Sequence, residues 1–214
     1  MPEPASQWIV PRIWPGATAV IAASGPSMAR EDLEAVQGRY PVIVVNDTWR
    51  LATWADVLYA CDHKWWRKHG GVPEFAGLKI TISNSQPYTD EWPAVKIVEN
   101  TGTEGLELSP HGVRTGRNSG YQAINLAVHF GARRIVLLGY DMKAAPDGRT
   151  HWFGDHADWP TAPAIFANTF LPHFDKLAVE LGKAGVEVLN ASRETALETF
   201  KRVKLEEILS ADRL

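Results

Sequence analysis

The chain has 214 residues, of which 45% are hydrophobic and 22% are charged, and its formal net charge is −3. This composition is ordinary for a globular domain and gives no electrostatic footprint for a nucleic-acid partner. No run approaches the ~20 apolar residues of a membrane span, and the start, Met-Pro-Glu-Pro-Ala, lacks the pattern of a signal peptide, so we expect a cytoplasmic protein.

Strands and helices alternate along the chain, which predicts an α/β, Rossmann-like fold with a mainly parallel sheet and helices on both faces. We expect one nucleotide-binding domain over 1–214, with a C-terminal arm over 203–214. Residues 144–163 are rich in Pro, Asp, His and Trp and break the alternation, which predicts a lid-like insertion. Strands are expected at 19–23, 42–45, 57–60, 79–82, 96–98, 135–138 and, last, 186–190; helices are expected at 30–37, 121–130, 166–184 and 205–209.

The first predicted strand ends in a turn of small residues, Ser24-Gly25-Pro26-Ser27. Gly25 lets the backbone turn tightly and Pro26 presets its own φ, so free N–H groups near the following helix could bind phosphate. Ser27 could cap that helix. A turn of this kind also serves purely steric purposes in many α/β proteins, so further elements must decide its role.

A second loop, Arg117-Asn118-Ser119-Gly120, leads into the helix expected at 121–130. A guanidinium beside a helix N-terminus can hold a phosphate or a sugar carboxylate at two points. The Ser119 hydroxyl and the Gly120 N–H would complete this cradle. The alternative is that Arg117 only ties down the loop.

Polar residues follow three more predicted strands, where open α/β sheets hold their ligands. The Asn46 amide could pair with a base or ribose edge, or serve a plain turn. Asp62 could bind a ribose hydroxyl or a metal ion, or form an Asx turn. Asp141 could orient a substrate hydroxyl, bind Mg²⁺ or cap its turn. The one cysteine, Cys61, excludes an internal disulfide, and its apolar strand favours a buried thiol over a nucleophile.

These segments resemble the bacterial sialyltransferases that use CMP-activated sugars, whose matching stretches are strand-Gly-Asn-Gly-Pro-Ser and Arg-x-Thr-Ser-Gly. Residues 139–151, Gly-Tyr-Asp-Met through Asp-Gly-Arg-Thr-His, resemble the DUF115 group, which includes motility-associated flagellin glycosyltransferases and an archaeal hydroxymethylpterin diphosphokinase. Residues 54–66, beginning Trp-Ala-Asp, are similar to small phage and prophage proteins. The resemblance spans roughly 17–203 and implies transfer of either a sugar or a pyrophosphate.

The resemblance to the sialyltransferases also implies roles for individual residues. Asn46 would contact the nucleotide, whereas Ser24 stands where those enzymes carry asparagine. A lid histidine would act as general base on the acceptor hydroxyl, while phenolic hydroxyls stabilise the leaving phosphate. The lid offers His151 and His156, and a neutral imidazole suits proton abstraction near pH 7. We prefer His151, because its Gly-Arg-Thr-His context matches the DUF115 pattern.

The leading interpretation is a glycosyltransferase-like enzyme that binds a nucleotide-activated sugar, preferentially CMP-linked, and passes the sugar to an acceptor hydroxyl without a cofactor. One alternative is a pterin-type diphosphokinase that uses ATP and Mg²⁺, held by Asp62 and Asp141. Another is a non-catalytic, phage-encoded nucleotide-binding module. The acceptor and the oligomeric state stay open, and a hydroxymethylated DNA base is one conceivable acceptor.

The lid also contains a possible metal-binding cluster. His151 and His156, together with Asp155 and Asp158, carry the donor atoms of a transition-metal site. Their spacing matches no recognised metal signature, so we predict no metal site.

Overall fold

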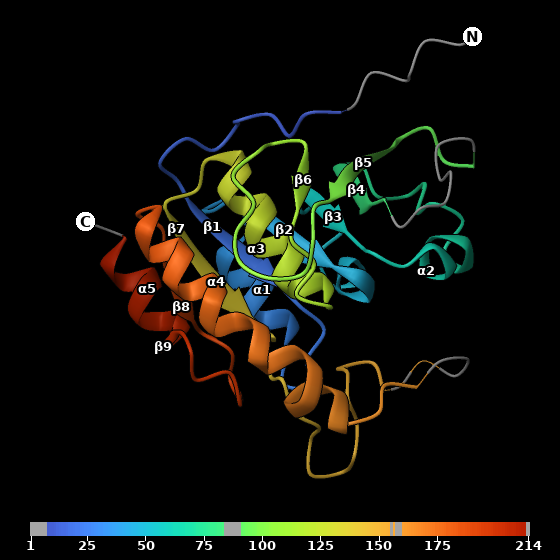
Figure 1. Cartoon of the computed structure of the whole chain (residues 1–214). Helices are drawn as coiled ribbons and strands as arrows, with labels where there is room; N and C mark the ends of the chain where they lie inside the picture. Colours follow the sequence, from blue (N-terminus) through green and yellow to red (C-terminus); the bar gives the residue numbers. More distant parts are fainter. Residues whose placement is uncertain (1–7, 84–90, 155, 157–159, 213–214) are drawn as a thin grey trace, which may run out of the picture.

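The computed structural model describes residues 8–83, 91–154, 156 and 160–212, and in these residues nine parallel strands form one sheet (Figure 1). The strands are β1 (Thr18–Ala22), β2 (Val42–Val45), β3 (Val57–Tyr59), β4 (Leu78–Ile82), β5 (Val95–Asn100), β6 (Gly112–Val113), β7 (Arg134–Leu138), β8 (Glu187–Asn190) and β9 (Lys201–Arg202). They lie in the order β6-β5-β4-β3-β2-β1-β7-β8-β9. The predicted parallel α/β sheet is confirmed.

Helices cover both faces of the sheet, as expected from central strands whose residues are buried on both sides. On one face, Ala19 and Ile21 of β1 join a core with α3 (Ser119–Phe130) and α4 (Leu171–Lys183). On the other face, Val20 and Ala22 join a core with α1 (Arg30–Val36), α2 (His63–Lys68) and α5 (Leu205–Ala211). No helix in the described ranges has the length and apolar character needed to cross a membrane.

The sheet has a switch point between β1 and β7. The strands from β1 to β6 are added outward on one side, and the chain then returns through α3 so that β7 pairs with the free edge of β1. The chain leaves β1 for α1 on one face of the sheet and leaves β7 for α4 on the other. At such a switch point, open α/β sheets have a ligand-binding crevice outside the carboxyl ends of their strands. This is the crevice that the sequence predicts.

Two sequence predictions about the C-terminal third are wrong. The strand expected to be the last, at 186–190, is followed by another strand, β9. The two residues of β9 are exposed, and their sequence has no apolar pattern. The helix expected at 166–184 is interrupted, because its first five residues form a π-helical turn, η2 (Phe166–Phe170), before α4 begins. Pro172 explains the interruption, since its ring lacks an N–H and clashes with the carbonyl four residues earlier in a regular helix.

Candidate functional site

A pocket of about 510 Å³ lies at the carboxyl ends of β1, β2, β3 and β7, under residues of the lid. The structure brings nearly all of the predicted site residues together there. Ser27 is the exception, as it does not line the pocket. The predicted residues that do are Ser24, Gly25, Pro26, Asn46, Asp62, Arg117, Asn118, Ser119, Gly120, Asp141, His151 and His156.

The turn after β1 is built differently from the prediction. Its N–H groups are used within the protein, because Gly25 donates to the Gly139 carbonyl oxygen at 2.9 Å and Ser27 donates to Asp141 at 2.7 Å. Ser27 also does not cap α1, whose N-cap is Ala29; its hydroxyl donates to Asp141 at 2.9 Å. The turn therefore joins β1 to the loop after β7, and these two N–H groups are not free to bind a phosphate.

Gly25 allows this close joining of β1 to β7. A Cβ atom at residue 25 would overlap the Asp141 carboxylate and would lie 2.5 Å from the Gly139 oxygen. We expect Gly25→Ala to lower the free energy of unfolding by at least about 2 kcal/mol, the scale of overpacking in a closed site. Urea denaturation measures this change. Gly182→Ala is the control, because no atom of the described residues lies within 4 Å of the added carbon. Unchanged stability of Gly25→Ala would contradict the proposed packing.

Asp141 is a buried carboxyl whose two oxygens both accept hydrogen bonds from Ser27. Burial raises the pKa of Asp141 to about 6, and the hydrogen bonds from Ser27 oppose that rise only in part. These hydrogen bonds hold the turn after β1 against the loop after β7, and the catalytic use of Asp141 to orient a substrate hydroxyl stays a prediction from the sequence.

The raised pKa predicts how stability depends on pH. The ordinary pKa of the carboxyl is 3.8, so between about pH 4 and pH 6 the folded protein holds a proton that the unfolded chain has released. As the pH rises from about 4 to 6, the free energy of unfolding should therefore fall, and the Asp141 carboxyl contributes up to about 3 kcal/mol to this fall. Asp141→Asn should remove that fall, measured by urea denaturation at several pH values.

The control is Asp147→Asn. Arg149 lowers the pKa of this exposed carboxyl, so its substitution should change the pH dependence in the opposite direction. Parallel curves for Asp141→Asn and the wild type would show that Asp141 does not titrate as its burial implies.

The N-terminus of α3 opens into the pocket. Asn118 is the N-cap, as its side chain accepts the Tyr121 N–H at 2.8 Å, so it serves the helix more than a ligand. The Ser119 hydroxyl donates to the Cys61 sulfur at 3.1 Å and is likewise engaged. In the described part of the chain, no acceptor is assigned to the N–H groups of Ser119 and Gly120. These two donors lie where a phosphate would be stabilised.

Arg117 stands beside that helix end. Its side chain is exposed, it lines the pocket, and no carboxylate of the described residues pairs with it. Its backbone has φ of +59°, a conformation that is strained for a residue with a side chain. The alternative prediction, an arginine that ties down its loop, finds no such contact among the described residues.

Backbone strain gathers at this pocket. In the described ranges four residues other than glycine have positive φ, and three of them, Asn46, Arg117 and Met142, line the pocket. Such strain persists where surrounding structure enforces it, which is common at functional sites. The side chain of Asn46 lies at the pocket, and its oxygen is buried without a hydrogen-bond partner among the described residues. Such an unsatisfied buried acceptor is uncommon in a folded protein.

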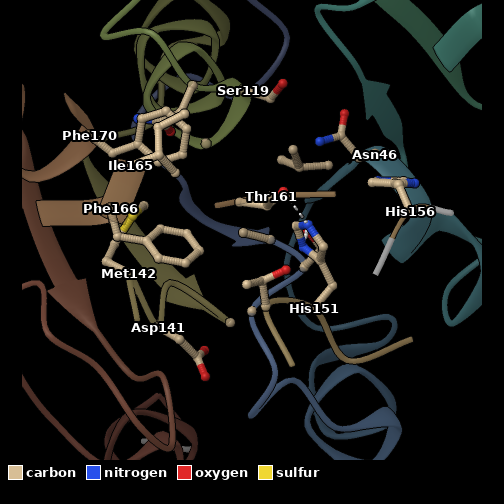
Figure 2. Close-up of a pocket in the computed structure, with 18 of the residues that line it drawn as sticks. Asn46, Ser119, Asp141, Met142, His151, His156, Thr161, Ile165, Phe166 and Phe170 are labelled. Atoms are coloured by element: carbon tan, nitrogen blue, oxygen red, sulfur yellow. Dashed lines mark hydrogen bonds between the residues drawn. The ribbon is translucent and has the colours of Figure 1, made fainter. Parts of the chain in front are cut away.

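His151 lies centrally in the pocket (Figure 2). One ring nitrogen, Nδ1, is 3.1 Å from the Ser24 hydroxyl, and the other, Nε2, is 3.1 Å from the Thr161 hydroxyl. The ring stacks on Phe153 with the planes at 3°. The lid is also fixed to β1 by the Trp152 N–H, which donates to the Ser24 carbonyl oxygen. Ser24 therefore contacts the histidine and the lid, and no contact of it with a nucleotide is needed to explain its position.

Asp47 is a buried acid that sequence reasoning missed. It accepts the indole N–H of Trp65 at 2.8 Å and lies 3.6 Å from His69, 3.8 Å from Arg50 and 3.9 Å from His156. Burial lowers the pKa of His156, while the Asp47 carboxylate opposes this. The only sequence signal was its place directly after Asn46 at a strand end.

Other groups in the pocket are less suited to chemistry. Burial, together with the nearby charge of Asp62, raises the pKa of the Cys61 thiol to about 12, so Cys61 is no nucleophile at neutral pH. No three acidic, histidine or cysteine side chains in the described ranges gather to hold a metal ion. Asp155 and Asp158 lie outside the described residues. No tyrosine lines the pocket among the described residues, unlike the pattern implied by the sialyltransferases.

Comparison with known proteins gives a likeness of fold. No family model matches the chain, and no curated protein sequence matches it. Among solved structures, the chain is similar to the sialyltransferase CstII from Campylobacter jejuni, solved in complex with a substrate analogue, cytidine-5'-monophosphate. The two are 12% identical, the match covers 87% of this chain and 84% of that chain, and the TM-score is 0.53. This supports a sialyltransferase-like fold, whereas the DUF115 and phage resemblances gain no support.

Proposed function

We propose that this protein is a glycosyltransferase that binds a nucleotide-activated sugar, preferentially CMP-linked, and transfers the sugar to an acceptor hydroxyl. The observation that carries the proposal is that the Asn46 amide, Arg117 and the open end of α3 line one pocket. A nucleotide needs both kinds of group, a polar edge for its base or ribose and a cationic, N–H-rich end for its phosphate. The fold of a CMP-binding sialyltransferase supports this assignment.

The proposed chemistry uses His151 as general base. A neutral imidazole accepts a proton at one nitrogen, and Nε2 already lies within hydrogen-bond distance of an alcohol, the Thr161 hydroxyl. An acceptor hydroxyl at that place would lose its proton to Nε2 as its oxygen attacks the sugar. The bond between the sugar and the nucleotide phosphate breaks, and Arg117 with the N–H groups of Ser119 and Gly120 would stabilise the leaving phosphate.

The contacts of Asp141 argue against the diphosphokinase alternative. That reaction needs carboxylates that remain charged and available to Mg²⁺. Both oxygens of Asp141 are engaged by Ser27, which suits a structural carboxyl better than a metal ligand. Of the two carboxylates proposed to hold Mg²⁺, Asp141 is buried and Asp62 is exposed in the pocket, which leaves one accessible carboxylate for the metal ion.

Calorimetry with CMP, CDP, UDP, GDP and ATP tests the proposal, each in Mg²⁺ and in EDTA. We expect CMP to bind, and the binding to survive EDTA, because protein groups and not a metal ion neutralise the phosphate. A requirement for ATP with Mg²⁺ would favour the diphosphokinase. Absence of binding by every nucleotide would contradict both activities, and CMP binding without turnover would favour the non-catalytic module.

A further inference from the structure

One side of the pocket is apolar. Figure 2 shows Met142, Ile165, Phe166 and Phe170 together on the side opposite Asn46 and His156. Phe166 and Phe170 lie edge to face, with ring centroids 5.9 Å apart and planes at 72°. Phe166 is buried, whereas the other three side chains are half-buried, so part of their apolar surface is left open. We call these four residues the apolar wall.

The apolar wall is shaped by unusual backbone. Ile165 immediately precedes the π-helical turn η2, and Phe166 and Phe170 are its first and last residues. Met142 is held at φ of +49°. Both features are locally unfavourable, and such irregularities occur often at functional sites. These irregularities and the open apolar surface lie in the lining of the same pocket.

The Thr161 hydroxyl marks the position of an attacking oxygen. It lies 3.1 Å from Nε2 of His151, at the place that the acceptor hydroxyl needs. In Figure 2, His151 and Thr161 lie between the apolar wall and the Asn46 side. If the nucleotide occupies the Asn46 side, an acceptor that displaces Thr161 can rest the remainder of its structure on the apolar wall.

We infer that the acceptor is an alcohol that carries an aromatic or similarly apolar ring, and that the apolar wall binds this ring. The inference rests on the proposed function. The four side chains offer no hydrogen-bonding group to match the hydroxyls of a bare sugar, whose desolvation would oppose binding. An apolar ring has no such penalty and gains both burial and edge-to-face contact with the two phenyl rings.

The test measures binding of two probes in sequence. CMP binding is first established by calorimetry. Pairs of phenyl and methyl β-glycosides, in which both members of a pair carry the same sugar, are then titrated into the CMP-saturated protein. Their binding is followed by ligand-observed NMR. We expect the phenyl compound to bind at least about tenfold more tightly than its methyl counterpart, as burial of one ring allows. Phe170→Ala and Ile165→Ser should each reduce this preference to about threefold or less, with CMP affinity unchanged.

Val179→Ala is the matched control, because Val179 is an apolar residue of α4 that is exposed outside the pocket. It should keep the full preference for the phenyl compound. If CMP binds but the two glycosides bind equally, or neither binds, the inference is overturned while the proposed nucleotide site stands. If CMP itself does not bind, the proposed function fails, and the inference fails with it.

Discussion

His151→Ala is expected to slow the release of CMP from a CMP-linked sugar, in the presence of an acceptor alcohol, by a factor of about 10² to 10⁴. This is the usual contribution of a positioned general base. The affinity for CMP should change by no more than a few tenths of a kcal/mol, because the imidazole acts on the acceptor proton and not on the nucleotide. Turnover assays and calorimetry on the same preparations separate the two effects.

The control for His151 is His173→Ala, which removes a histidine of α4 that does not line the pocket and should leave turnover unchanged. His156→Ala provides the discriminating comparison. Its ring lies beside Asp47, which gives it a partner that could orient an imidazole for catalysis. An active His151→Ala enzyme together with an inactive His156→Ala enzyme would assign the general base to His156.

Arg117→Ala should weaken CMP binding by about 1.5–3 kcal/mol, or roughly 10- to 150-fold, the scale of a hydrogen bond to a charged group. The free energy of unfolding should change little, because Arg117 is exposed and pairs with no carboxylate among the described residues. Calorimetry measures the affinity, and urea denaturation measures the stability.

Arg67→Ala is the control for loss of a cation. Arg67 pairs with Glu91 outside the pocket, so its removal should not weaken CMP binding. If Arg117→Ala binds CMP as tightly as the wild type does, Arg117 is a residue of loop structure and the phosphate must be held elsewhere.

The sequence predicted the fold well because burial patterns encode it directly. The runs at 42–45 and 135–138 are apolar because both faces of a parallel strand are covered, and such runs are visible without any tertiary information. β9 carries no such signal, since Lys201 and Arg202 are exposed at the edge of the sheet. The π-helical turn was also missed, because helical spacing of apolar residues does not distinguish it from the α-helix that follows.

The residues that line the pocket could be predicted from the sequence, but their contacts could not. Strand ends converge in any parallel sheet, so Asn46, Asp62 and Ser24 could be expected at one edge. Which groups are free for a ligand depends on contacts between distant segments. Ser27 binds Asp141 across the switch point, and no local pattern announces such a pair. The positive φ of Asn46 is likewise imposed by the surrounding structure and cannot be read from its neighbours in sequence.

The pairing of β1 with β7 has a consequence for the order in which this protein matures. Thr18 of β1 lies opposite Arg134 of β7. During synthesis this edge of β1 therefore stays unpaired until residues 134–138 have left the ribosome. The turn at Gly25 cannot close before then, because its hydrogen-bond partners Gly139 and Asp141 arrive with β7. A small molecule that occupies this crevice can therefore not guide early folding, and its stabilising effect begins only once the two halves of the sheet have met.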